Sequence, residues 1–306
     1  MTALTDEGRA DTGVAVETPL HRFVAEFAAS KLALVGLVVL AAILVIAIFA
    51  PWLSPQNPYD LAALDLLDGR LPPGSASADR AITYWLGTDD QGRDMLSAIF
   101  YGLRTSLAVG VLSAGVALMI GTALGLIAAY IGGRMESLIM RLVDLQLSFP
   151  AILVALILLA LLGQGVGKII LALVVVQWAY FARTVRGSAL VERRKEYIEA
   201  ARCLALSDAR IMLHHLLPNC LPPLIVVLTV QVAHAIALEA TLSFLGIGLP
   251  ITEPSLGLLI ANGFEYIMSG KYWISLFPGV ALLIAIMSIN LVGDRLRDIL
   301  NPRLQK

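Results

Sequence analysis

The chain has 306 residues, of which 58% are hydrophobic and only 15% are charged, and its mean hydropathy is +0.82. A soluble core of this size cannot hide so much apolar surface, so the composition excludes an ordinary soluble domain and predicts a membrane protein. The formal net charge of −1 carries no nucleic-acid-binding footprint, although the Lys and Arg residues are unevenly distributed along the chain.

Six apolar segments predict an all-α integral membrane protein with six transmembrane helices. The first segment, at about 20 residues, matches the hydrocarbon thickness of a bilayer and lacks a cleavage site, so we expect an uncleaved helix. The fourth is short and spans only if Lys168 snorkels and the helix extends towards Arg183. The predicted spans are residues 32–50, 105–131, 145–162, 169–182, 221–249 and 272–292.

The distribution of basic residues predicts which side of the membrane each loop occupies. With the N-terminus inside, one side receives Arg22, Lys31, Arg134, Arg141, the cluster from Arg183 to Arg210, Arg295, Arg297, Arg303 and Lys306. Cytoplasmic loops carry this excess of positive charge. We therefore expect both termini in the cytoplasm. The predicted parts are a tail at 1–31, the first helix at 32–50, an extracytoplasmic loop at 51–103, a core of five spans at 104–293 that contains a basic loop at 183–218, and a tail at 294–306.

The loop at 51–103 is rich in Pro and Asp, which predicts a solvated and only partly ordered segment. Near its end, residues 86–94 indicate a turn at the membrane surface followed by a helix start, with Thr88 or Asp89 as the N-cap. In the next span, Gly121 and Gly125 form a small-xxx-small pair that predicts close packing against another helix. In the third span, Pro150 is expected to kink the helix.

Polar side chains inside the spans mark either a translocation path or hydrogen bonds between helices, and both interpretations remain open. His234 and Glu239 are five positions apart and share no helix face, which argues against a local proton relay. Asp144 is expected to pair with Arg141 at i, i+3. The candidates for the path are Asp144, Gln177, Gln231, His234 and Glu239.

The basic loop from Arg183 to Pro218 combines charge with helical periodicity. One apolar stripe is formed by Tyr197, Ala201, Leu204 and Ala205. Ser207 is placed to cap a second short helix, so the loop predicts a helix–turn–helix on the inner face. Anionic lipid could hold such a hairpin, but the small side chains of Ala200 and Ala201, ringed by charge, favour a docking site for a partner protein.

No motif in the chain supplies an enzyme active site. A phosphate-binding Gly-x-x-x-x-Gly-Lys-Ser/Thr loop is absent, as are the His-Glu-x-x-His and Gly-x-Ser-x-Gly patterns. The two cysteines, Cys203 and Cys220, have no compact four-ligand spacing with His214 and His215, so we expect no metal site. An energy-coupled role would require ATP hydrolysis on another chain.

Several ordered motifs together resemble a known family. They are Glu199-Ala200-Ala201 followed by His215-Leu216-Leu217-Pro218, residues 86–94, residues 242–246, residues 277–279 and residues 290–303. Nearly the whole chain is thus similar to the permease subunits of ATP-binding-cassette (ABC) importers, and specifically to the C-type subunit of the dipeptide, oligopeptide and nickel family. The resemblance implies a type I ABC importer permease fold, with a cytoplasmic coupling helix, in a bacterial inner membrane.

The resemblance also implies partners and a coupling site. The partners would be a second homologous permease subunit, two ATPase subunits that hold ATP and Mg, an extracytoplasmic solute-binding protein and the lipid bilayer. Peptides are the implied substrate, with nickel or another small solute as the alternative. The residues implied in coupling to the ATPase are Arg193, Arg194, Tyr197, Glu199, Ala200, Ala201, Arg202, Ala205, Leu217 and Pro218.

One position departs from the family pattern. The family usually has Gly four residues after the second Ala of its Glu-Ala-Ala motif, whereas this chain has Ala205. A left-handed conformation costs alanine about 1 kcal/mol or more, so we expect the bend to pass through Leu206 and Ser207 instead.

Two other protein classes fit the sequence less well than the importer. A self-sufficient secondary transporter or channel should show internal inverted repeats and paired membrane charges, and the sequence shows no such repeat and few charges. A membrane-embedded enzyme would need convergent acid, base or metal ligands, which are also missing.

Overall fold

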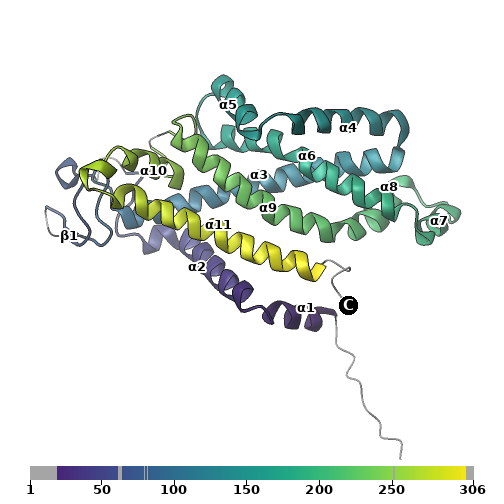
Figure 1. Cartoon of the computed structure of the whole chain (residues 1–306), viewed down its shortest axis with the longest axis horizontal. Helices are drawn as coiled ribbons and strands as arrows, with labels where there is room; N and C mark the ends of the chain where they lie inside the picture. The colour runs from purple at the N-terminus through teal and green to yellow at the C-terminus, as the bar shows by residue number, and fades with distance from the viewer. Residues whose placement is uncertain (1–18, 61–63, 79, 81, 251, 301–306) are drawn as a thin grey trace, which may run out of the picture.

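The computed structural model describes residues 19–60, 64–78, 80, 82–250 and 252–300, and most of them are helical. Five long helices run side by side along the molecule (Figure 1): α2 Lys31–Leu53, α3 Met95–Ile131, α6 Val166–Glu192, α9 Leu217–Phe244 and α11 Trp273–Leu300. The shorter elements are α1 Pro19–Ala28, α4 Gly133–Ser148, α5 Ala151–Leu162, α7 Glu196–Cys203, α8 Asp208–Arg210, the π-helical turn η3 Ile211–Leu216, α10 Leu256–Phe264, the 3-10 turns η2 Leu66–Asp68 and η4 Ile267–Ser269, and the strands β1 Ser75–Ala76 and β2 Thr83–Tyr84.

Within the described residues, five helices are long and apolar enough to cross a membrane, and a sixth span results if α4 and α5 count as one. The predicted third span, residues 145–162, is not one straight helix, because α4 and α5 meet at 92°, so the kink predicted at Pro150 is a sharp break. The break falls at Phe149, which is extended, and Pro150, which caps α5. Proline has no N–H to donate and forces the preceding residue out of the helical conformation, so the chain turns here.

The other spans are longer than their apolar segments. The fourth span, predicted as short, is the 27-residue helix α6, which continues past Arg183 to Glu192. The fifth begins at Asp208 rather than 221 and ends at Phe244 rather than 249. The sixth continues to Leu300, so residues 294–300 of the predicted tail are helical. At the end of the fourth span, the start of the fifth and the end of the sixth, the helix continues beyond the point where the side chains become polar.

The segment predicted as a partly ordered loop is largely folded into a cap at one end of the bundle (Figure 1). Strands β1 and β2 pair antiparallel there, with Ser75 opposite Tyr84, while residues 61–63, 79 and 81 lie outside the described part. The fully buried side chains of Asp89 and Arg93 form an ion pair at 2.6 Å. Trp273 Nε1 donates to the main-chain oxygen of Thr88 at 3.2 Å, which ties the cap to α11.

The helix that follows the cap has a different N-cap from the one predicted. The carboxylate of Asp94 accepts hydrogen bonds from the Ser97 main-chain N–H at 2.9 Å and from the Ser97 hydroxyl at 2.6 Å. The Thr88 hydroxyl instead donates to the main-chain oxygen of Asp68. Gly92 has a φ of +78°, so the chain is still turning after Thr88 and Asp89 and cannot enter the helix there.

The predicted close packing at Gly121 and Gly125 occurs within this chain, between α3 and α6. A Cβ atom on Gly121 would lie 2.4 Å from the main-chain oxygen of Trp178, and one on Gly125 would lie 2.6 Å from that of Ala182. Only glycine permits this approach of two helix backbones. The contact fixes α6, and with it the segment that follows α6, against α3.

Candidate functional site

The predicted helix–turn–helix is present at the end of the bundle opposite the cap, where α7 projects (Figure 1). We call residues 193–210 the coupling hairpin. Its first helix begins at Glu196, because residues 193–195 form a turn after α6. Its second helix is not short, since α8 and η3 lead without interruption into α9. The hairpin is therefore continuous with two membrane-crossing helices.

Two apolar side chains seat the coupling hairpin on the helix bundle. Ile198 and Ala201 are 0% and 4% exposed, and they pack in a cluster with Val185, Ile211 and Leu216. The predicted stripe is wrong for its other members, because Tyr197, Leu204 and Ala205 are exposed. The buried face of α7 is instead formed by the i, i+3 pair Ile198 and Ala201, so Ala201 supports the hairpin from beneath.

The turn of the coupling hairpin passes through Ala205 itself. Ala205 has a φ of +52°, so the predicted bend through Leu206 and Ser207 is wrong. The Leu206 N–H donates to the Ala201 carbonyl at 3.3 Å, and the Ala205 N–H donates to the Arg202 carbonyl at 2.9 Å. These bonds form a Schellman motif, which satisfies the last carbonyls of α7 and offsets the strain at Ala205. Ser207 occupies the N-cap position of α8 without a capping side-chain hydrogen bond.

Three contacts fasten the coupling hairpin to the end of α3. Arg193 donates to the main-chain oxygen of Ala129 at 2.6 Å. The Arg202 guanidinium lies 5.6 Å from the centre of the Tyr130 ring. The Tyr130 hydroxyl donates to Asp208 Oδ1 at 2.5 Å. Tyr130 therefore contacts both helices of the hairpin.

Glu192 braces the turn between α6 and α7. It accepts hydrogen bonds from Lys195 Nζ and from the Tyr197 hydroxyl, each at 2.7 Å. Desolvation and the hydrogen bond to Glu192 raise the pKa of Tyr197 to about 12, so its hydroxyl remains a donor at neutral pH. Tyr197, predicted as a coupling residue, thus has a structural contact in this chain.

A polar groove of about 360 Å³ lies on the exposed side of the coupling hairpin, and it is lined by Leu190, Arg193, Arg194, Glu199 and Arg202. Glu199 and Ala200 are exposed. Among the described residues, no hydrogen bond or ion pair engages the Glu199 carboxylate. Leu217 is half-buried and Pro218 exposed at the start of α9, beyond the groove. The groove presents charges that can engage a partner protein.

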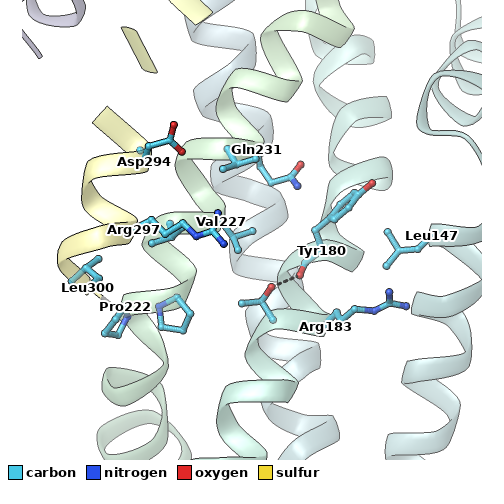
Figure 2. A pocket seen from close by; sticks show the side chains of 14 residues that line it. Leu147, Tyr180, Arg183, Pro222, Val227, Gln231, Asp294, Arg297 and Leu300 are labelled. Atoms are coloured by element: carbon cyan, nitrogen blue, oxygen red, sulfur yellow. Dashed lines mark hydrogen bonds between the residues drawn. The ribbon is translucent and has the colours of Figure 1, made fainter. Parts of the chain in front are cut away.

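A cavity of about 820 Å³ is the second feature, and it opens between α4, α6, α9 and α11 (Figure 2). Its lining residues near the start of α9 place it in the half of the bundle nearer the coupling hairpin. Its polar lining residues are Tyr180, Arg183, Thr184, Gln231, Asp294 and Arg297. Its apolar lining includes Leu147, Pro222, Pro223, Val226, Val227, Val230 and Leu300. We call this space the inner cavity.

Of the five predicted path residues, one lines the inner cavity and two others contact its lining residues. Gln231 lines it. The fully buried Gln177 donates from Nε2 to the main-chain oxygen of Gln231 at 3.0 Å. Asp144 on α4 forms an ion pair at 2.5 Å with the lining residue Arg183 on α6. The predicted pairing of Asp144 with Arg141 is therefore wrong, because the pair between the two helices replaces the local one.

His234 and Glu239 do not line the inner cavity. Glu239 is fully buried and accepts hydrogen bonds at 2.8 Å from the hydroxyls of Ser106 and Ser243, which is the inter-helix alternative to a path role. Sequence reasoning did not select Tyr180, Asp294 or Arg297. Asp294 and Arg297 lie in the predicted tail at 294–306, although their i, i+3 spacing beyond a long apolar run is compatible with one more helical turn.

The described residues contain no group of three His, Cys, Asp or Glu side chains that could hold a metal ion. Cys203 is exposed on the coupling hairpin, and Cys220 is buried in α9.

Comparisons with known proteins agree with this architecture. Residues 121–306 match the family described as "Binding-protein-dependent transport system inner membrane component", and residues 18–73 match the "N-terminal TM domain of oligopeptide transport permease C". The chain belongs to this family of inner membrane transport components, and it is a permease subunit of the ABC importer class. The predicted family and the all-α membrane fold are thereby confirmed.

Individual relatives cover almost the full chain. A putative peptide transport system permease protein of Brucella suis is 42% identical over 271 residues, which are 89% of this chain and 88% of the relative. The di/tripeptide transport system permease protein DppC of Pseudomonas aeruginosa is 35% identical over 305 residues, covering 100% and 99% of the two chains. An inward-facing structure of the MetNI methionine ABC transporter shares the fold, with a TM-score of 0.55 and 21% identity over 68% of this chain and 98% of that chain.

Proposed function

We propose that this permease subunit forms half of the translocation path of an ATP-driven importer for dipeptides and oligopeptides. Its partners are a second permease subunit, two ATPase subunits that hold ATP and Mg, and a solute-binding protein that delivers the peptide from outside. The peptide substrate rests on the names of relatives that align along nearly the whole chain. Nickel or another small solute is the alternative substrate.

The coupling hairpin is the observation that carries the proposal. It is exposed at Glu199 and Ala200, yet it is continuous with α6 and α9 and is fastened to α3 through Tyr130. An ATPase subunit that binds the groove would move α7 as a rigid body, because the buried side chains of Ile198 and Ala201 pack closely against the helix bundle. The sequence contains no phosphate-binding loop, so ATP would be hydrolysed by an ATPase subunit that binds at the coupling hairpin or at another exposed surface of this chain.

The movement would pass from the coupling hairpin to the inner cavity. Because α6 and α9 both line this cavity and both join the hairpin, a displacement of α7 changes the space between them. ATP binding would draw the two ATPases together and rock the spans of the two permease subunits between inward-open and outward-open arrangements.

The arrangement of the ends supports a cytoplasmic location for both termini. Helix α1 and the end of α11 lie at the same end of the bundle as the coupling hairpin (Figure 1). The cap and α10 lie at the opposite end, which would face the solute-binding protein outside the cell.

The test is reconstitution of the four-subunit complex in proteoliposomes, with the solute-binding protein added outside and radiolabelled tri-L-alanine as substrate. Glu199→Ala and Arg194→Glu should each lower ATP-dependent uptake by roughly tenfold or more, since breaking a charged contact at an interface costs about 2–5 kcal/mol. The matched control is Asp298→Ala, an exposed carboxylate near the end of α11 that does not line the groove. Uptake that needs neither the ATPase subunits nor ATP would contradict the proposal and favour a secondary transporter or channel.

A further inference from the structure

The inner cavity has the size and wall chemistry of a small-molecule site. At about 820 Å³ it falls within the range of roughly 300–1,000 Å³ that is typical of ligand pockets. Apolar side chains from α9 form most of one wall, including Val226, Val227 and Val230. A few polar groups from α6, α9 and α11 converge on this apolar space (Figure 2). A ligand with both apolar and charged parts would match it.

Gln231 gives the strongest indication that the inner cavity binds a ligand, because it is a buried polar group whose partner is missing among the described residues. This lining residue is only 6% exposed, and its Oε1 atom has no hydrogen-bond partner among the described residues. Gln177 occupies the main-chain oxygen of Gln231 and leaves the side-chain amide available. In Figure 2 that amide extends from α9 towards Tyr180 on α6. A buried acceptor without a donor is unfavourable, and a peptide N–H from a ligand would satisfy it.

The charges around the inner cavity discriminate between the ends of a zwitterion. The Arg297 guanidinium points from α11 towards Val227 on α9 (Figure 2), and no ion pair engages it among the described residues. The other lining arginine, Arg183, is already paired with Asp144. Arg297 is therefore the cation available for a carboxylate, which its planar fork can bind through two hydrogen bonds.

Asp294 supplies the opposite charge on the same helix. It precedes Arg297 by three residues, or about 4.5 Å along the helix axis, and lies further from the end that bears the coupling hairpin. A carboxylate on the ligand is thus attracted to Arg297 and repelled by Asp294, whereas an ammonium group prefers Asp294.

We propose that the inner cavity is a transient binding site within the permease for a short zwitterionic peptide, in which Arg297 binds the C-terminal carboxylate, Gln231 bonds a peptide N–H and Asp294 faces the amino end. This inference rests on the proposed function and adds to it a selection step inside the membrane subunit. The carboxylate leads towards the cytoplasm in this arrangement.

The experiment uses the permease–ATPase complex in phosphatidylcholine nanodiscs, without ATP and without the solute-binding protein. Binding of tri-L-alanine and of its C-terminal amide is measured by isothermal titration calorimetry. Tri-L-alanine should bind at least about tenfold more tightly than the amide, as expected for a charge-assisted hydrogen bond. Arg297→Ala should abolish this preference, Arg297→Lys should retain part of it, and Gln231→Leu should weaken both ligands.

Asp298→Asn is the matched control, because Asp298 is an exposed neighbour of Arg297 that does not line the inner cavity. It should leave the preference unchanged. The inference would be overturned if the wild-type complex bound tri-L-alanine and its amide equally well. It would also be overturned if the complex bound neither ligand but still imported tri-L-alanine with ATP and the solute-binding protein. Either result would leave the proposed function standing. Loss of that import in the same wild-type preparation would count against the proposed function instead. Carboxylate preference that survives in Arg297→Ala would place the site elsewhere and also overturn the inference.

Discussion

Ala205 holds the turn of the coupling hairpin in a conformation that side chains other than glycine rarely adopt. Its φ of +52° costs roughly 1–2 kcal/mol relative to glycine, and its exposed position means that no packing contact requires the methyl group. The Schellman hydrogen bonds of Ala205 and Leu206 offset the cost. The strain therefore arises because the residue is alanine, and the turn would keep the same geometry with glycine at this position.

Ala205→Gly should raise the free energy of unfolding by about 1 kcal/mol, because it relieves this strain without changing the turn. The matched control is Ala200→Gly, an exposed position inside α7 where the same substitution should destabilise by roughly 0.5–1 kcal/mol. Chemical denaturation of the purified complex measures both. If Ala205→Gly destabilised the complex as Ala200→Gly does, the left-handed turn at Ala205 would be wrong.

Asp94 is a capping residue that carries its charge in a buried place. Desolvation raises the pKa of the Asp94 carboxyl above its ordinary value, despite the hydrogen bonds from Ser97 that oppose the rise. Asp94→Ala should cost about 1–2 kcal/mol through loss of the cap, and Asp94→Asn should cost less because the amide oxygen can still accept. Thermal unfolding of the purified complex distinguishes the two variants.

The raised pKa of Asp94 also fixes a direction for pH dependence. A carboxyl whose folded-state pKa exceeds its unfolded value contributes stability at low pH, and this stability is lost as the pH rises through the folded pKa. The stability of the wild type relative to Asp94→Asn should therefore fall as the pH rises above the ordinary carboxyl range. A relative stability that increased with pH would contradict the burial of this charge.

At the scale of elements, the coupling hairpin and α3 form one mechanical unit. Tyr130 is the joint, since its ring faces Arg202 in α7 and its hydroxyl donates to Asp208 in α8. The close approach of α3 to α6 at Gly121 and Gly125 completes the unit from the other side. Motion of the hairpin should therefore move α3 and α6 together.

Tyr130→Phe keeps the ring beside Arg202 but removes the hydrogen bond to Asp208, so it tests this joint with a minimal change. A hydrogen bond to a charged group contributes about 1.5–3 kcal/mol, and we expect the number of peptides imported per ATP hydrolysed to fall several-fold while the ATPase subunits remain bound. Tyr272→Phe, an exposed residue just before α11, is the control and should leave this ratio unchanged. An unaltered ratio in Tyr130→Phe would show that the joint does not transmit motion.

How far the sequence predicts these elements depends on how local each signal is. Pro150 marks the break between α4 and α5, and the Gly-Ala-rich contact face of α3 is also readable, because each depends on neighbouring residues. The lengths of α6 and α11 cannot be predicted in this way, because hydropathy locates the end of the apolar run and not the last backbone hydrogen bond of the helix. The inner cavity could not be predicted because Gln231 and Arg297 are brought together only by packing of α9 against α11.

Within the coupling hairpin, the sequence predicts the helix–turn–helix but not which face is buried. The charged residues and Ser207 mark two helices with a turn between them, and the structure has both. Both Ile198 and Tyr197 share a helix face with Ala201, and packing against the rest of the bundle decides that Ile198 is the buried one. Among the predicted coupling residues, Arg194, Glu199 and Ala200 are exposed, whereas Ala201 is buried.

At the scale of the whole molecule, the bundle separates two surfaces with different tasks. The cap, with its buried Asp89–Arg93 pair, closes one end, and the coupling hairpin projects from the other (Figure 1). The inner cavity lies between them, nearer the hairpin. In the proposed importer the cap meets the solute-binding protein, the hairpin meets an ATPase, and the peptide passes the cavity between these two contacts.

Site-specific photocrosslinking at the exposed tip of the coupling hairpin tests most directly whether an ATPase subunit binds there. p-Benzoylphenylalanine replaces Ala200 in one variant of the assembled importer and Met268, which is 95% exposed near the capped end, in the other. After irradiation in membranes, mass spectrometry of the products should identify an ATPase subunit joined at position 200 and no ATPase at position 268. Crosslinks from position 200 to lipid alone, or to an ATPase from position 268, would contradict the assignment of the coupling hairpin as the point where ATP hydrolysis drives transport.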